Sequence, residues 1–209
     1  MKKLIAAMLL LCMAGFAPAG VSANVPQPPQ DMVKQTADSM LAKLKEERVV
    51  IRKDPGRIYD LVSSIVLPHF DFERMSSWVL GKYWRTATPA QKKRFSEEFR
   101  NLLVRTYATS LTEYTDRKIN YLPFRADPND TDVTVRTEVA QPGAASIPID
   151  YRLALTNDEW KVYDVSIDSV SLVTNYRTTF ANQIRQEGLD KLIEKLATRN
   201  EKSSAPSAK

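Results

Sequence analysis

Asp164 and Asp168 are the side chains of this sequence best placed for acid–base chemistry, because each interrupts an apolar, strand-like stretch. A carboxylate buried beside a cavity can have a raised pKa and act as a general base. The alternative is that both carboxylates face away from any cavity or accept hydrogen bonds from backbone groups. We adopt this structural interpretation and retain the general base as a rival.

The other residues that could take part in chemistry do not form a recognisable catalytic or metal-binding site. His69 is the only histidine and follows Pro68 at an expected helix end. Asp71 and Glu73 lie two residues apart, but we find no set of residues that completes a metal site, and both suit the start of a helix. The six glycines form no GxGxxG phosphate loop. The sequence therefore predicts no catalytic residue, no metal and no cofactor.

The first residues have the pattern of an export signal. Lys2 and Lys3 are followed by an unbroken apolar run of ten residues, 4–13. Small residues at 21–23 suit cleavage by signal peptidase after Ala23. The run is too short to cross a bilayer, which takes about 20 residues. We therefore predict a cleaved signal peptide over residues 1–23 and an exported product.

The single cysteine, Cys12, lies within this apolar run, so the exported chain would contain no disulfide. A lipoprotein cleavage site at Cys12 is the rival interpretation, but the bulky Leu11 precedes it where a small residue is expected. Removing residues 1–23 lowers the formal charge from +5 to +3 over 186 residues. This is a weak basis for binding a polyanion, and we expect no nucleic-acid partner.

The rest of the chain has the composition of an ordinary globular protein, since 43% of the whole sequence is apolar and 26% is charged. At this length it can bury one sizeable core. We predict one domain over residues 24–200 and a small, polar, disordered tail over 201–209.

Apolar residues recur with helical spacing in the first half of the chain. The best-defined helix starts at Thr88-Pro89-Ala90-Gln91, which combines a capping threonine, a proline at the first helical position and a glutamine three residues after the cap. This helix is expected to continue to Tyr114. Asp31 is expected to cap a helix over 31–48, one face of which carries Val33, Ala37, Met40, Leu41 and Leu44. Further helices are predicted over 54–68, 71–80 and 175–200, the last interrupted at Gly188.

After Asp116 the apolar period changes from 3.6 to 2, which is typical of strands. Long strands are predicted over 133–139, 147–155 and 160–172, with an edge strand over 118–125. In the third long strand the apolar phase slips between Val162 and Tyr163, which a bulge would explain. Asn157-Asp158 predicts a tight hairpin. Helices, then antiparallel strands, then helices make an α+β fold.

Several linked motifs run through the chain after residue 23. They are Asp54-Pro55, Leu80 to Trp84, Ala87 to Gln91, Phe95, Phe99, Trp160 to Val165, Val170 to Arg177, Phe180 and Gly188. Together these motifs resemble the MlaC/Ttg2 toluene-tolerance family, whose members are periplasmic phospholipid-binding proteins of the Mla pathway, and the resemblance covers essentially the whole chain after residue 23. Ser169 is a departure, because glycine is expected before the Val-Ser-Leu-Val run.

The resemblance implies a soluble carrier that moves phospholipids between the outer and inner membranes without an enzymatic step. It implies an NTF2-like, curved antiparallel sheet of about four strands, packed against N-terminal and C-terminal helices around an apolar cavity. The implied partners are phospholipid, an outer-membrane lipoprotein complex and an inner-membrane ABC transporter with an MCE-domain subunit. Two rivals stay open: an NTF2-like enzyme that uses Asp164 or Asp168 as base, and a lipid-free envelope adaptor.

The candidates for the cavity lining share the apolar faces of the predicted helices and strands. Val135, Leu153 and Val165 are expected to lie on the alternating apolar face of their strands. The full set of predicted lipid-binding residues is Phe95, Phe99, Leu103, Tyr107, Val133, Val135, Ile149, Tyr151, Leu153, Val165, Ile167, Leu172 and Phe180.

Overall fold

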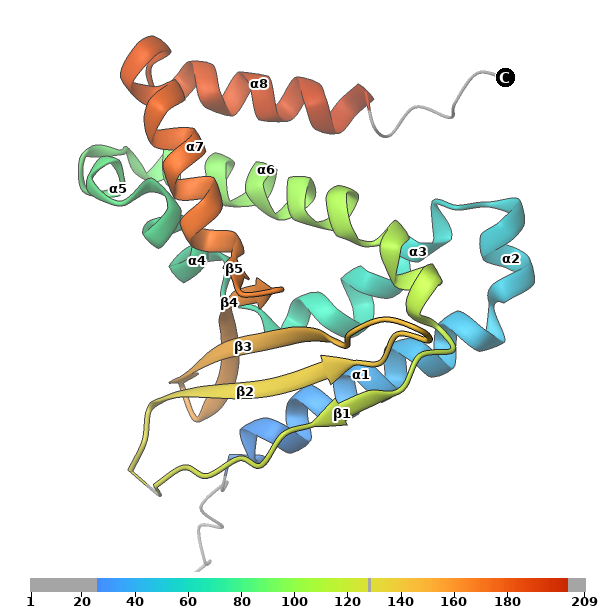
Figure 1. Cartoon of the computed structure of the whole chain (residues 1–209). Coiled ribbons are helices and arrows are strands. Elements are labelled where there is room, and N and C mark those ends of the chain that lie inside the picture. The colour runs from blue at the N-terminus through green and yellow to red at the C-terminus, as the bar shows by residue number, and fades with distance from the viewer. Residues whose placement is uncertain (1–25, 128, 203–209) are drawn as a thin grey trace, which may run out of the picture.

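The structure is a computed structural model that describes residues 26–127 and 129–202. Helices come first along the chain, an antiparallel sheet follows, and two helices end it (Figure 1). The predicted α+β class is therefore confirmed. The predicted signal peptide and residues 203–209 of the predicted tail lie outside the described residues. Within the described residues, no helix is both long enough and apolar enough to cross a membrane.

Helix α1 (Pro29–Glu46) begins before the predicted start at Asp31. Its N-cap is Pro28, Pro29 occupies the first turn, and no side chain caps the helix. Asp31 instead lies inside the first turn, where a negative charge favours the helix dipole. The prediction that Asp31 is the cap is wrong because proline itself fixes the backbone torsion with which a helix starts.

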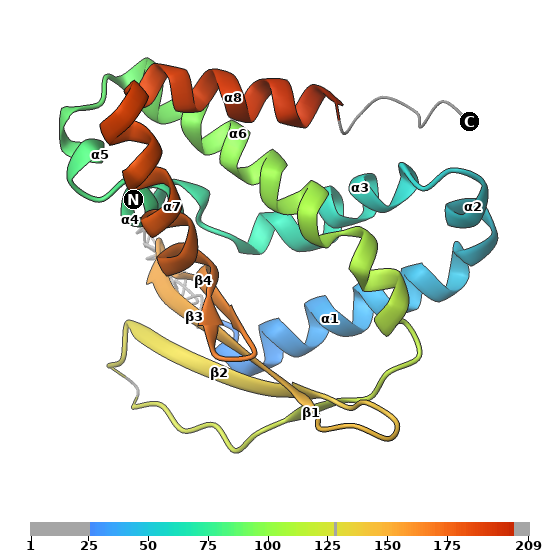
Figure 2. The ribbon, with the colours of Figure 1, turned by 45° about the horizontal axis from the view of Figure 1, so that its top comes forward.

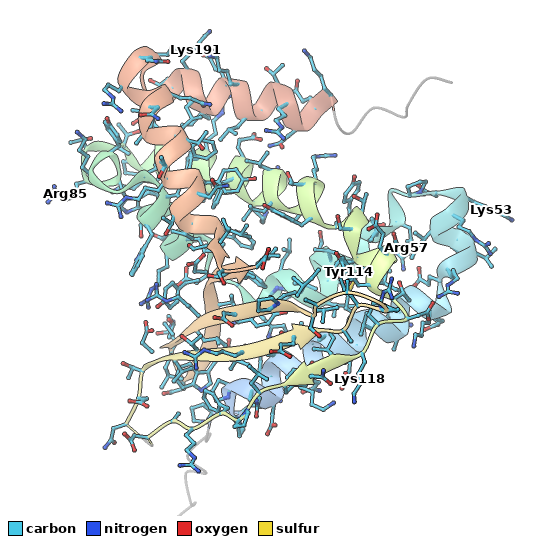
Figure 3. All side chains as sticks on the ribbon, in the orientation of Figure 1. Lys53, Arg57, Arg85, Tyr114, Lys118 and Lys191 are labelled. Atoms are coloured by element: carbon cyan, nitrogen blue, oxygen red, sulfur yellow. The ribbon has the colours of Figure 1, made fainter. Side chains whose placement is uncertain are left out.

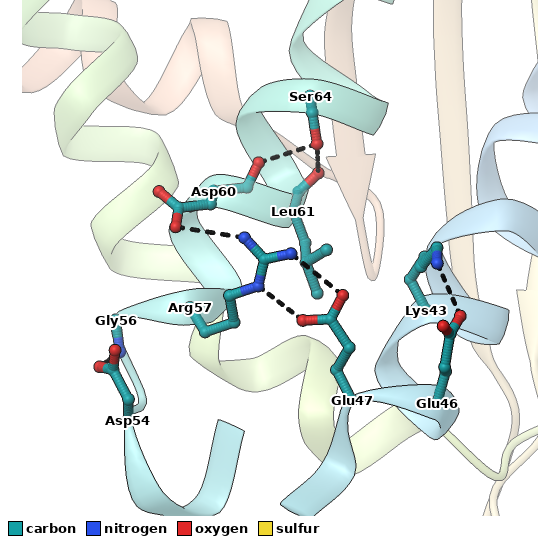
Figure 4. Close-up of polar contacts among 9 residues, drawn as sticks. All are labelled: Lys43, Glu46, Glu47, Asp54, Gly56, Arg57, Asp60, Leu61 and Ser64. Atoms are coloured by element: carbon teal, nitrogen blue, oxygen red, sulfur yellow. Dashed lines mark hydrogen bonds and ion pairs between the residues drawn. The ribbon is translucent and has the colours of Figure 1, made fainter. Parts of the chain in front are cut away.

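Two short helices, α2 (Arg48–Lys53) and α3 (Arg57–Leu61), form a hairpin at one end of the molecule (Figure 1). An ion pair closes this hairpin onto the end of α1: Arg57 Nε and Nη2 donate to the two carboxylate oxygens of Glu47 at 2.5 and 3.0 Å (Figure 4). The hydrogen bonds from Arg57 lower the pKa of Glu47. In the turn between the helices, Asp54 Oδ1 accepts the N–H of Gly56 at 2.9 Å.

A π-helical turn, η1 (Val62–Val66), and a 3₁₀ turn, η2 (Leu67–His69), connect α3 to α4 (Phe72–Leu80). Asp71 caps α4 by accepting the N–H of Arg74 at 2.8 Å. After α5 (Lys82–Thr86), helix α6 (Pro89–Tyr107) begins with the predicted capping box between Thr88 and Gln91. The helix predicted to reach Tyr114 changes to a 3₁₀ turn, η3 (Thr109–Tyr114).

In the part of the chain that the structure describes, the sheet has five antiparallel strands in chain order, one more than the four expected. They are β1 (Ile119–Tyr121), β2 (Asp132–Val139), β3 (Ile147–Thr156), β4 (Glu159–Ile167) and β5 (Val170–Ser171). The single strand predicted over 160–172 is wrong, because the chain folds back at Asp168 and Ser169. Both residues have a positive φ, of 50° and 65°.

Two other predicted features of the sheet, the bulge in β4 and the tight hairpin after β3, are confirmed. Arg152 pairs with Asp164 but the next residue, Leu153, pairs with Val162, so Tyr163 is the extra residue of a bulge. Asn157 and Asp158 both have a positive φ, as a two-residue hairpin between right-twisted strands requires. Because the bulge shifts the alternation by one residue, the apolar side chains before and after it in β4 point to the same face of the sheet, the face that the helices cover.

Ser169→Gly is expected to raise the free energy of unfolding by about 0.5–1 kcal/mol. Ser169 is exposed and holds a φ of 65°, which a side chain with a Cβ disfavours and glycine does not. The measurement is equilibrium denaturation with urea. Asn157→Gly is the matched control, because asparagine tolerates this backbone region and should gain less. A destabilised Ser169→Gly variant would contradict the backbone assigned to this turn.

Helices α7 (Leu172–Glu187) and α8 (Leu189–Lys202) end the described chain, with Gly188 at a φ of 86° between them. Helix α8 extends two residues past residue 200, where the lipid-binding domain is predicted to end. Figure 2 shows α8 along α6, and α1 beside the sheet; contacts join α8 to α6 and α1 to both β2 and η1. The helices thus form two groups, one around α6 and one around α1.

Candidate functional site

An apolar cavity of about 300 Å³ lies between two hydrophobic clusters of the interior. The larger cluster joins α4, α6, α7 and α8 to the sheet, and the smaller one joins α1, α2 and α3. Leu103 and Val165 from the larger cluster and Leu44 and Val62 from the smaller one all line the cavity. In this part of the molecule the cavity therefore separates the two clusters, and both contribute to its walls.

The walls of the cavity come from separate parts of the chain. The sheet contributes residues near one end of β2, β3 and β4, including Val139, Ile149 and Val165. Helix α1 faces them with a row that includes Ala37 and Leu41. The remaining wall is formed by η1, η2, the start of α4, the end of α6 and η3.

Seven of the thirteen predicted residues line this cavity. They come from the second half of α6, from the strands and from the start of α7: Leu103, Tyr107, Ile149, Tyr151, Val165, Ile167 and Leu172. The other six lie away from it: Phe95, Phe99, Val133, Val135, Leu153 and Phe180. All six are buried in the larger hydrophobic cluster. The structure thus places these six residues in the packed interior and not in the lining of this cavity.

The three phenylalanines lie outside the cavity because they pack against one another. Phe95 and Phe99 stack with ring centroids 5.8 Å apart, and Phe180 meets both edge-on at 5.9 and 6.1 Å. Tyr176 adds a further edge-on contact to Phe99 at 5.3 Å. This aromatic cluster fills the space between α6 and α7, so nothing of it reaches the cavity.

The three strand residues Val133, Val135 and Leu153 lie outside the cavity for a different reason. Val135, Tyr151 and Val165 are cross-strand neighbours and therefore share one face of the sheet. Toward the other end of that face, Leu153 pairs with Val133 and with Val162. Val135 and Leu153 are completely buried, whereas their cross-strand neighbours Tyr151 and Val162 line the cavity. Alternation along the strands identifies the face of the sheet but not which of its residues are covered.

The lining residues that were not predicted come from several elements, and α1 contributes more of them than any other element. Ala37, Met40, Leu41 and Leu44 are among them, together with Val62. The sequence does carry a signal for the α1 residues, since they share one apolar helix face. Nothing in the sequence places that face opposite the sheet.

The few polar groups of the lining are uncharged near neutral pH. Burial lowers the pKa of His69 and raises the pKa of Tyr107 to about 12. Burial also raises the pKa of Tyr151. Thr36 Oγ1 donates to the carbonyl of Met32 at 2.8 Å, so it is satisfied within α1. The described lining contains no Asp, Glu, Lys or Arg, which suits a hydrocarbon chain and not a charged substrate.

Asp164 is positioned as a structural group and not as a base facing the cavity. It is 3% exposed, and its two carboxylate oxygens accept hydrogen bonds from Ser171 Oγ at 2.7 Å and from the N–H of Val173 at 3.1 Å. It thereby holds the β5 turn against the first turn of α7. Asp168 is exposed in that turn. No group of three or more residues able to hold a metal occurs in the described parts of the chain.

Asp164→Asn is expected to cost about 1–3 kcal/mol of stability, because an amide replaces a buried charged acceptor of two hydrogen bonds. Asp168→Asn, the matched control, should change stability by less than about 0.5 kcal/mol. Lipid transfer by the folded protein should be preserved in both variants. Loss of transfer at an unchanged melting temperature would revive a direct role for the carboxylates.

Comparisons with known proteins agree on one family. The model of the MlaC protein family matches residues 34–198. The toluene tolerance protein Ttg2D of Pseudomonas putida is 32% identical over 89% of this chain and 86% of its own length. The intermembrane phospholipid transport system binding protein MlaC of Haemophilus influenzae is 27% identical over 80% of each chain. A phospholipid-binding protein of Ralstonia solanacearum, solved in complex with a phospholipid, superposes with a TM-score of 0.79 at 33% identity, covering 86% of this chain and all of the other.

Proposed function

Because this chain belongs to the MlaC family, we propose that it is a periplasmic carrier that holds a phospholipid by its acyl chains and shuttles it between the outer and inner membranes. The observation that carries the proposal is the uncharged apolar cavity between the sheet and α1. The phospholipid complex of the Ralstonia relative and the transport-system name of the Haemophilus relative support it.

The energetics of a lipid in water explain why such a carrier needs a cavity. A diacyl lipid exposes roughly 30 methylene groups, each worth about 0.8 kcal/mol when buried, so an unaided crossing would cost about 20 kcal/mol. An empty apolar cavity of about 300 Å³ has its own cost, about 7 kcal/mol at 24 cal/mol per Å³. The acyl-chain atoms that enter the cavity reduce both costs, which favours a lipid-filled state.

We expect weak selectivity among head groups. The tails need burial but the polar head can remain in water, and the described lining offers no charged side chain to read it. Lipid exchange across several head groups should therefore differ by much less than a hundredfold, which corresponds to about 2.7 kcal/mol.

The site of action and the partners that we propose are those that the family resemblance implies. We propose that residues 1–23 are removed on export, that residues 24–200 form the lipid-binding domain, and that the carrier works in the periplasm. Its proposed partners are an outer-membrane lipoprotein complex and an inner-membrane ABC transporter with an MCE-domain subunit. No catalytic step is required of it, and the hydrogen bonds of Asp164 to Ser171 and Val173 disfavour the enzymatic rival.

Organic extraction of the protein purified from the envelope, followed by mass spectrometry, tests the proposal. We expect near-stoichiometric glycerophospholipid. A small bound metabolite would favour the enzyme instead, and protein free of any lipid would favour the adaptor. Either result would overturn the carrier.

A further inference from the structure

The helical hairpin at one end of the molecule exposes two adjacent aliphatic side chains. Val49 and Val50 of α2 are 56% and 50% exposed. Ile51, which follows Val50, is buried and packs into the smaller hydrophobic cluster. The inward side of α2 is thus anchored, and the two valines are held outward. We call the residues Arg48, Val49, Val50, Arg52 and Lys53 the α2 tip.

Helix α2 is basic, although Glu47 directly precedes it and the exposed Asp54 directly follows it. The sequence of α2, Arg-Val-Val-Ile-Arg-Lys, has three cations and no acidic residue. Arg48 is paired with Asp116 at 2.6 Å, whereas neither Arg52 nor Lys53 forms an ion pair with any residue in the part of the chain that the structure describes. At 100° per residue, Lys53 falls between the two valines on the helix surface. Figure 3 shows Lys53 at the outer end of the molecule, directed away from its body.

We propose that the α2 tip docks on the surface of a bilayer that contains anionic phospholipids. Exposed aliphatic side chains with cations beside them are suited to the interface, where the apolar groups enter the acyl boundary and the cations meet phosphate. A protein partner is a poorer fit. The tip has no aromatic residue, and valine is under-represented among the residues that dominate protein interfaces.

The place of the α2 tip in the fold gives the docking a consequence. Helix α2 is joined to α1 on one side and leads through α3 to η1 on the other, and both neighbours line the cavity with residues such as Leu44 and Val62. The ion pair between Glu47 and Arg57 fixes the hairpin to these walls. Docking by the tip therefore brings the wall of the cavity close to the membrane. This consequence rests on the proposed function, but the docking itself does not.

Flotation with lipid vesicles tests the docking. The protein should begin at residue 24, because the apolar run at 4–13 would itself enter a bilayer. Vesicles of phosphatidylcholine alone are compared with vesicles that contain one third phosphatidylglycerol, at low and at high salt. We expect binding to the anionic vesicles that salt weakens, and little binding to the neutral ones.

Two variants and a matched control identify the surface. Arg52→Gln/Lys53→Gln should weaken binding about 30-fold, from roughly 1 kcal/mol for each cation near an anionic surface. Val49→Ser/Val50→Ser should weaken it about tenfold or more without changing the net charge. The control, Lys191→Gln/Lys195→Gln, removes two exposed cations from α8 and should change binding less than threefold. All six side chains are exposed, so melting temperatures should be preserved.

Three outcomes would overturn the docking: no binding of the wild-type protein to anionic vesicles, equal binding to neutral vesicles, or equal losses in the α2 and α8 variants. Lipid extraction separates this inference from the proposed function. Protein that carries phospholipid but ignores vesicles refutes the docking alone. Protein that binds vesicles through the α2 tip but carries no lipid refutes the carrier alone.

Discussion

The double substitution Ala37→Trp/Val165→Trp is expected to reduce bound phospholipid to less than about a tenth of the wild-type amount per folded molecule. Ala37 lies on the α1 wall of the cavity and Val165 on the sheet wall, so two indole rings would enter it from both sides. Their stability cost should be modest, because the rings occupy existing space. The measurement is extracted phospholipid per folded protein, together with thermal denaturation.

Val135→Trp is the matched control for this experiment. Val135 and Val165 flank Tyr151 on neighbouring strands and share a face of the sheet, but Val135 is completely buried and lies outside the cavity. Tryptophan there should overpack the interior and cost typically 1–3 kcal/mol or more, while the folded fraction keeps its lipid. Full lipid content in the double variant, or lipid lost only in the control, would mean that the cavity is misplaced.

Phe99→Ala is expected to lower the free energy of unfolding by about 3–5 kcal/mol, the usual cost of removing a buried phenylalanine. Phe99 is completely buried, and its ring contacts Phe95, Tyr176 and Phe180. Denaturation with urea measures the change. Because Phe99 packs between α6 and α7 and not along the cavity, the folded fraction should keep its phospholipid.

Phe99→Leu provides the control for this variant, since it retains most of the apolar volume and should cost clearly less. A loss below about 1 kcal/mol in Phe99→Ala would contradict the packed aromatic cluster. If folded Phe99→Ala loses its phospholipid while Phe99→Leu keeps it, Phe99 belongs to the binding site, as the sequence predicts.

The contrast between Phe99 and Leu103 shows how far the sequence predicts the site. Both lie on one apolar arc of α6, four residues apart, and helical spacing predicts burial for each. Phe99 packs against α7, whereas Leu103, one turn later, borders the cavity. Periodicity reports which face of a helix is buried. It carries no information about the separation between that face and the next element, and this separation decides between core and cavity.

The strands show the same limit and one further limit. The phase slip at Tyr163 predicts the bulge correctly, because a bulge changes the alternation that the sequence displays. The turn at Asp168 and Ser169 leaves no such trace. Asp and Ser are common in turns, but they give a weaker signal than glycine or asparagine, and apolar residues continue on both sides of them, so the sequence predicts one strand where the structure has β4 and β5. Asp164 could be assigned a structural role from the sequence, but its partners Ser171 and Val173 become neighbours only through that turn.

The central claim is that the cavity between the sheet and α1 holds the acyl chains, and a phospholipid with brominated acyl chains tests it most directly. A crystal structure of the loaded protein locates the bromine atoms by their anomalous scattering. We expect the bromine peaks inside the cavity, within contact distance of Leu41, Leu103 and Val165. Bromine peaks between α6 and α8, or on the outer surface with the cavity closed, would contradict the account.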